Sequence, residues 1–164
     1  MHLRLLAERS IAAAPAAVYA LVLDGNRFAP LFEGYGPIPG LERIQPLGPV
    51  EVGAVREVRD LRGAVLHERI TALEPSQRHA YTLYDLPAPL SWLAREGRAE
   101  WRFQAMADDP GATRVSWRYD FELTGPWAWP LAWPVLRGAM QPAMRGCLER
   151  IAQTLEQAWR AERR

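Results

Sequence analysis

Residues 113–123 read TRVSWRYDFEL, and from Val115 onward every second residue is apolar or aromatic. A repeat of two residues is typical of a β-strand, because successive side chains point to opposite faces of a sheet. Residues 95–106 alternate in the same way around Trp101 and Phe103. Both segments therefore predict strands with one aromatic, buried face and one charged, solvated face.

Five more runs have the composition and turn boundaries of strands, namely 2–11, 41–47, 54–60, 64–73 and 79–84. Two short helices are expected after the first strand, over 13–24 and around 26–32. Because most of these strands follow one another through short turns, they predict an antiparallel sheet of about seven strands.

Residues 129–160 predict one long helix at the end of the chain. Its apolar residues recur at spacings of three and four, which places them on one side of a helix. They are Leu136, Met140, Met144, Leu148, Ile151, Leu155 and Trp159. We therefore expect an α+β protein in which a curved sheet wraps around this helix and leaves a cavity between them.

The bulk properties predict one domain over residues 1–164 and exclude several classes of function. A net charge of +1 argues against general attraction to nucleic acid. All 20 basic residues are arginine, which excludes Schiff-base and P-loop lysines. Cys147 is the only cysteine, so no intramolecular disulfide can form. With no apolar run that predicts a signal peptide or a membrane-spanning helix, a cytoplasmic protein is expected.

The pattern resembles the helix-grip proteins of the START-like (SRPBCC) superfamily, and in particular their polyketide cyclase/dehydrase-like branch. The residues that carry the resemblance are ERSIAAAPAAVYALVLD (8–24), FEGYGPIPGL (32–41), VGAVREV (52–58), HERITALEP (67–75), GATRVSWRYDF (111–121) and the closing helix. The resemblance implies a hydrophobic cavity for a small or lipid-like molecule between the sheet and the C-terminal helix. Relatives of this kind include lipid carriers, ligand sensors, quinone-binding proteins and aromatase/cyclases.

A charged pair is expected inside the sheet. If DLRGA (60–64) forms a hairpin with Asp60 opposite Ala64, then Arg56 lies opposite Glu68, between the apolar pairs Val58–Leu66 and Ala54–Ile70. On the concave face this would be a buried ion pair. A register that differs by one residue would instead expose it to solvent.

Three aromatic stretches are candidates for the mouth of the cavity. FEGYGPIPGLE (32–42) predicts a rigid, non-helical corner with Tyr35 beside the ligand, and its prolines remove backbone donors that a phosphate-binding loop would need. The stretch TGPWAWPLAWP (124–134) allows three interpretations: packing, a cavity gate that includes Trp133, or transient contact with a membrane. A second possible gate is LSWLAREG (90–97), around Trp92.

The leading functional hypothesis is binding of a hydrophobic or lipid-like small molecule, without stable insertion into a membrane. Neither metal nor cofactor is expected, because the three histidines are dispersed and no cofactor or nucleophile motif occurs. The predicted ligand-binding residues are Tyr35, Arg56, Glu68, Tyr81, Trp92, Trp101, Trp117, Tyr119, Trp133, Met140 and Met144.

Two other classes of function stay open. One is a cyclase, dehydratase or isomerase that uses Glu68 as acid or base, with Arg56 or a tyrosine polarising a carbonyl. The other is a partner-binding module without a ligand. The sequence leaves the oligomeric state open as well.

Overall fold

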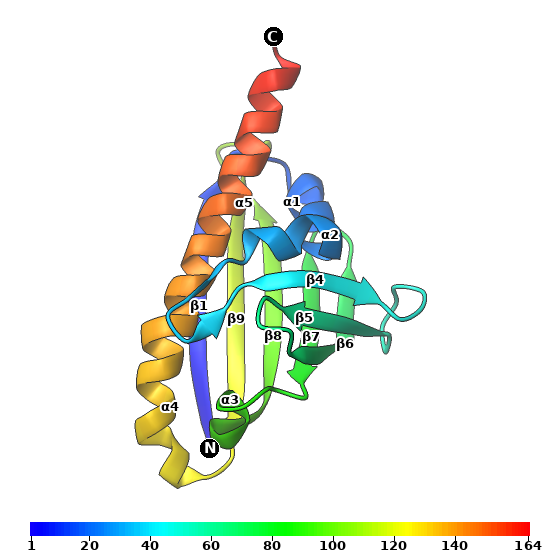
Figure 1. The fold of residues 1–164 in the computed structure, drawn as a ribbon. Coiled ribbons are helices and arrows are strands. Elements are labelled where there is room, and N and C mark those ends of the chain that lie inside the picture. The colour runs from blue at the N-terminus through cyan, green and yellow to red at the C-terminus, as the bar shows by residue number, and fades with distance from the viewer.

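A computed structural model describes residues 1–164 and contains one large antiparallel sheet (Figure 1). Its seven strands lie in the order β1-β9-β8-β7-β6-β5-β4. Their bounds are β1 (His2–Ile11), β4 (Leu41–Pro46), β5 (Val55–Asp60), β6 (Val65–Glu74), β7 (Arg78–Tyr84), β8 (Ala94–Ala105) and β9 (Thr113–Leu123). Each predicted strand is therefore present, and only the boundaries differ by a few residues.

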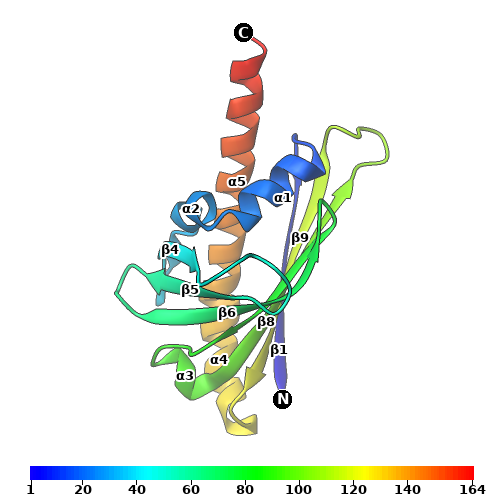
Figure 2. The same cartoon turned by 90° about the vertical axis from the view of Figure 1, so that its right-hand side faces the viewer.

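The helices follow the predicted order. After β1 come α1 (Pro15–Leu23), α2 (Gly25–Phe28) and a 3-10 turn (Ala29–Leu31). The short helix α3 (Leu90–Leu93) precedes β8, and the chain closes with a 3-10 turn (Pro126–Ala128), α4 (Trp129–Val135) and α5 (Gln141–Glu162). Figures 1 and 2 show the sheet curving around α5, with α1 and α2 on the same side. The predicted helix-grip architecture is confirmed, and no helix is long and apolar enough to cross a membrane.

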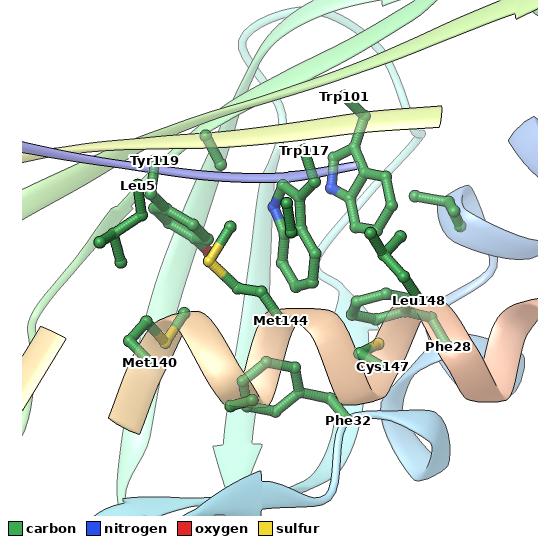
Figure 3. Close-up of a cluster of buried hydrophobic side chains, with 14 of the residues drawn as sticks. Leu5, Phe28, Phe32, Trp101, Trp117, Tyr119, Met140, Met144, Cys147 and Leu148 are labelled. Atoms are coloured by element: carbon green, nitrogen blue, oxygen red, sulfur yellow. The ribbon is translucent and has the colours of Figure 1, made fainter. Parts of the chain in front are cut away.

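The core lies between the sheet and α5 (Figure 3). The indole rings of Trp101 and Trp117 stack with centroids 4.2 Å apart, and the ring of Phe28 meets both edge-on. From α5, Met144 and Leu148 enter the same cluster and are fully or almost fully buried. The aromatic alternation of β8 and β9 thus supplies the large apolar area that holds the helix against the sheet.

A π-helical turn over Leu136–Met140 interrupts the predicted single helix. Within it the backbone N–H of Gln141 donates to the carbonyl of Leu136, five residues earlier. Pro142 follows at once and has no N–H to donate, so regular α-helical bonding cannot pass through this point. Of the residues in the predicted apolar stripe, Trp159 alone is exposed, at 46%, and the others are buried.

The glycine- and proline-rich corner forms a hairpin of β2 (Gly34–Tyr35) and β3 (Ile38–Pro39). The prediction of a non-helical corner is thereby confirmed. Gly34 has φ of 77°, and a Cβ atom there would lie 2.2 Å from the carbonyl oxygen of Ile38. Only glycine satisfies both the backbone conformation and the close approach of the two strands.

We predict that Gly34→Ala lowers the free energy of unfolding by about 1–3 kcal/mol more than Gly53→Ala does. Gly53 is a matched control, because its φ of 91° is also positive but a Cβ atom there meets nothing within 4 Å. The difference in urea denaturation therefore isolates the steric clash. Equal effects of the two substitutions would contradict this description of the hairpin.

Candidate functional site

A cavity of about 90 Å³ lies between the concave face of the sheet and the π-helical turn. Its walls come from the strands β3 to β7 and β9, from the helices α2 and α3, and from Phe32, Pro87 and Met140. Of its seventeen lining residues thirteen are hydrophobic, and apart from two prolines the others are Asp60 and Glu68. The cavity is therefore an apolar space with a few polar groups, as expected for a small-molecule site.

Two tyrosine hydroxyls and a carboxylate meet at the cavity wall. The hydroxyl oxygens of Tyr81 and Tyr119 lie 3.0 Å apart, and both side chains are buried. Burial raises the pKa of each phenol well above its ordinary value, so both hydroxyls are protonated at neutral pH. One hydroxyl donates to the other, which leaves the second proton free for another acceptor.

Arg56 holds the carboxylate of Glu68 in place. Its Nη2 atom donates to Oε2 of Glu68 at 2.6 Å, and both side chains are at most 5% exposed. The same Nη2 lies 3.3 Å from Nε2 of His79, and Nη1 donates to the carbonyl oxygen of Leu23 at 3.1 Å. Because Leu23 ends α1, one guanidinium group ties α1 to three strands of the sheet.

The environment shifts the pKa values of the two groups that contact Arg56. Burial raises the pKa of the Glu68 carboxyl, and the charge and hydrogen bond of Arg56 oppose that rise. Burial, followed by the positive charge of Arg56, lowers the pKa of His79 to about 3. His79 is therefore neutral at pH 7 and accepts a hydrogen bond from Arg56 through Nε2.

A match to the family model described as polyketide cyclase/dehydrase and lipid transport covers residues 2–156. The chain belongs to this family. The Zhui aromatase/cyclase from Streptomyces is similar in structure, with a TM-score of 0.74, 17% sequence identity, and coverage of 99% of this chain and 98% of the other. The match to the family model establishes the polyketide cyclase/dehydrase family. The similarity to the aromatase/cyclase, at 17% identity, shows a shared fold.

Two further solved structures share the architecture. Norcoclaurine synthase from Thalictrum flavum, in complex with a transition-state analogue, has a TM-score of 0.72 and 11% identity, with 96% of each chain covered. The protein Ara h 8.0201 has a TM-score of 0.64 and 13% identity, with 92% of this chain and 98% of the other covered. No curated protein sequence gives a significant match.

Five of the predicted site residues line the cavity of this polyketide cyclase-family protein. They are Glu68, Tyr81, Trp117, Tyr119 and Met140. The pairing of Arg56 with Glu68 is confirmed, together with the flanking pair Val58–Leu66. Arg56 and Trp101 stand behind the cavity wall around the charged cluster. Met144 is fully buried in the core but does not line the cavity.

Three predicted residues lie outside the cavity, so their predicted place at its wall is corrected. Tyr35, Trp92 and Trp133 are 58%, 66% and 47% exposed. In the corner the cavity is lined by Ile38 and Pro39, because Tyr35 sits at the tip of the hairpin. In the stretch around Trp92, which was expected to form a gate, Leu90 of α3 lines the cavity instead.

His79 and Asp60 are site residues that the sequence analysis missed. A β-bulge between Ile70 and Ala72 shifts the pairing of β6 with β7, and it brings His79 and Tyr81 to the face that carries Glu68. Asp60 accepts hydrogen bonds from the backbone N–H groups of Arg62 and Ala64 through Oδ1, which fixes the β5–β6 turn. An acidic residue at the first position of a turn was the available signal for Asp60.

A larger hollow, of about 710 Å³, is bordered mainly by polar and charged residues. Its arginines are largely neutralised by neighbouring acids, as in the pairs Arg78–Glu100, Arg98–Glu96 and Arg4–Asp120. It shares Tyr81 and Tyr119 with the smaller cavity, but most of its lining is polar or charged, whereas the lining of the smaller cavity is almost wholly apolar around Glu68. We therefore place the candidate site at the smaller cavity. No cluster of three or more His, Cys, Asp or Glu side chains suits a metal ion.

We predict that Glu68→Ala lowers the free energy of unfolding by about 3–5 kcal/mol, because it leaves the buried guanidinium of Arg56 without its anion. The matched control is Glu57→Ala. Glu57 follows Arg56 in β5, and its side chain is half-buried and makes no ion pair. Its expected effect is below about 1 kcal/mol. Small and equal effects in denaturant unfolding would contradict a buried pair.

The depressed pKa of His79 predicts a loss of stability in acid. In the unfolded chain His79 takes up a proton near pH 6.5, whereas in the folded protein it does so only near pH 3. Protonation between these two pH values therefore favours the unfolded chain, so the free energy of unfolding is highest above pH 6.5 and declines as the pH falls. Between pH 7 and pH 4.5 the stability advantage of the wild type over His79→Gln should shrink by about 2–3 kcal/mol. An advantage that stays constant over this range would show that His79 is not held neutral.

Proposed function

We propose that this protein binds a small, largely hydrophobic molecule that carries a hydroxyl or carbonyl group, in the cavity between the sheet and the C-terminal helical segment. The observation that carries the proposal is the meeting of Glu68, Tyr81 and Tyr119 at the wall of an otherwise apolar cavity. Apolar walls supply affinity through burial, while a few fixed polar groups select orientation.

Glu68 offers an acceptor, and donors come from the tyrosine pair and from the indole N–H of Trp117, which has no hydrogen-bond partner within the protein. Oε2 of Glu68 accepts a hydrogen bond from Arg56, and this is the only hydrogen bond that the protein makes to the carboxylate, so Oε1 is available to a ligand. The tyrosine pair supplies one hydroxyl proton that the pair itself does not use. A ligand hydroxyl can thus donate to Glu68, and a ligand hydroxyl or carbonyl oxygen can accept from a tyrosine.

The volume of the cavity limits the size of the ligand that fits without rearrangement. At about 90 Å³ it is smaller than the roughly 150 Å³ cavity that accommodates benzene in an engineered protein. Even a ligand with one aromatic ring therefore displaces part of the wall, and a ligand with two rings displaces more. Met140 is the residue most able to move, because its side chain is unbranched and flexible and stands in the π-helical turn.

Acid–base catalysis on such a ligand is a second candidate, and the environment of Glu68 favours it. A carboxyl group with a raised pKa and one free oxygen, fixed beside a tyrosine hydroxyl, has the features of a general acid or base. Two of the similar solved structures are named as an aromatase/cyclase and a synthase. In this chain the same cavity would then serve a cyclase, dehydratase or isomerase.

We expect calorimetric titration to give tighter binding of 2-naphthol than of naphthalene, by about tenfold, because only the former can hydrogen-bond to the polar groups. Tyr119→Phe should abolish this preference. Tyr84→Phe is the control, since Tyr84 stacks on His67 outside the cavity. Equal affinities, or no binding of either compound, would contradict the proposal. Release of a chemically altered molecule after binding would favour the catalytic candidate.

A further inference from the structure

The segment Pro126–Val135, PWAWPLAWPV, contains no charged residue and lies at the surface. Its exposed fractions are 62% for Trp127, 43% for Trp129, 57% for Leu131 and 47% for Trp133. A helix that is apolar on every side is normally buried in a protein core or in a membrane. Here the large side chains have no covering element within the chain.

Small residues, rather than the tryptophans, attach this segment to the body of the protein. Ala128, Ala132 and Leu136 recur every four residues and are completely buried. An ordinary surface helix places its large apolar residues inward and its polar residues outward. Here the small side chains face inward and the large apolar ones face outward. The exposure of the tryptophans therefore follows from the sequence of the segment and from the side on which it packs against the protein.

A fourth tryptophan extends this surface. Trp92 on α3 is 66% exposed, and its carbonyl oxygen accepts a hydrogen bond from the Thr124 hydroxyl at 2.8 Å, just before the segment begins. Figures 1 and 2 both place α3 and α4 at the same end of the molecule, opposite the C-terminus. We call this surface the tryptophan face; it consists of Trp92, Trp127, Trp129, Leu131 and Trp133.

The charged residues within the two segments that carry the tryptophan face are all arginines. Neither 86–95 nor 124–148 contains an aspartate or glutamate. Arg95 and Arg137 flank the face, are exposed, and form no salt bridge. Tryptophan is the residue most typical of the membrane–water interface, and unpaired arginines are attracted to anionic headgroups.

We propose that the tryptophan face docks the protein reversibly on the surface of an anionic phospholipid bilayer. The projecting rings enter the headgroup region, and the arginines contact lipid phosphates. One element that carries the face, α3, reaches the cavity through Leu90, and the π-helical turn that follows α4 reaches it through Met140. Docking therefore places the cavity wall next to the bilayer, although the docking itself requires no cavity ligand.

The test is sedimentation of the whole protein with vesicles of phosphatidylcholine alone and of phosphatidylcholine with 30% phosphatidylglycerol, at low salt. We expect the wild type to bind the anionic vesicles, and the double variant Trp127→Ser/Trp133→Ser to bind them at least about tenfold more weakly. Trp159→Ser is the matched control, because Trp159 is 46% exposed at the opposite end of the molecule. It should bind as the wild type does.

Two further measurements separate the bilayer from other occupants of this face. Arg95→Gln/Arg137→Gln should weaken binding to the anionic vesicles and leave any binding to pure phosphatidylcholine unchanged. Failure of the wild type to bind anionic vesicles, or an equal loss with Trp159→Ser, would overturn the proposal. Concentration-dependent dimerisation that the tryptophan variant abolishes, without vesicle binding, would also overturn it and assign the face to a second copy of the chain.

Discussion

The buried ion pair between Arg56 and Glu68 constrains both the fold and the candidate site. Neither side chain is more than 5% exposed, so each depends on the other for compensation of its charge. Arg56 also contacts His79 on β7 and the end of α1. The pair therefore stabilises the observed register of β5 against β6, and that register places the carboxylate of Glu68 at the cavity wall.

Side-chain periodicity and turn residues were sufficient to predict the regular strands and the hairpins that join them. The turn at residues 60–64 led to the pairing of Arg56 with Glu68 as one of two possible registers, and the structure selects that register over the one-residue slip. The aromatic alternation of β8 and β9 identified Trp117 and Tyr119 as inward-facing. The resemblance to helix-grip proteins then supplied the expectation of a cavity.

Local irregularities explain what the sequence could not predict. Counting outward from the pair Glu74–Arg78 without a bulge would place Tyr84 opposite Glu68, whereas Leu83 occupies that position. The single inserted residue turns His79 and Tyr81 toward Glu68, and no sequence signal marked it. Trp92 and Trp133 were placed at the cavity because they stand in irregular stretches near its expected mouth, but their side chains are exposed, and the sequence does not tell which side of such a stretch faces inward.

The central claim is that ligands bind in the cavity that Met140 lines. The chain contains four methionines, and their methyl groups give separate NMR signals when labelled with ¹³C. Met140 lines the cavity, Met144 lies in the adjacent core, and Met1 and Met106 lie elsewhere. Titration with 2-naphthol should shift the Met140 signal progressively to saturation and leave those of Met1 and Met106 in place. A Met140 signal that does not move, while the protein binds the compound, would contradict the account.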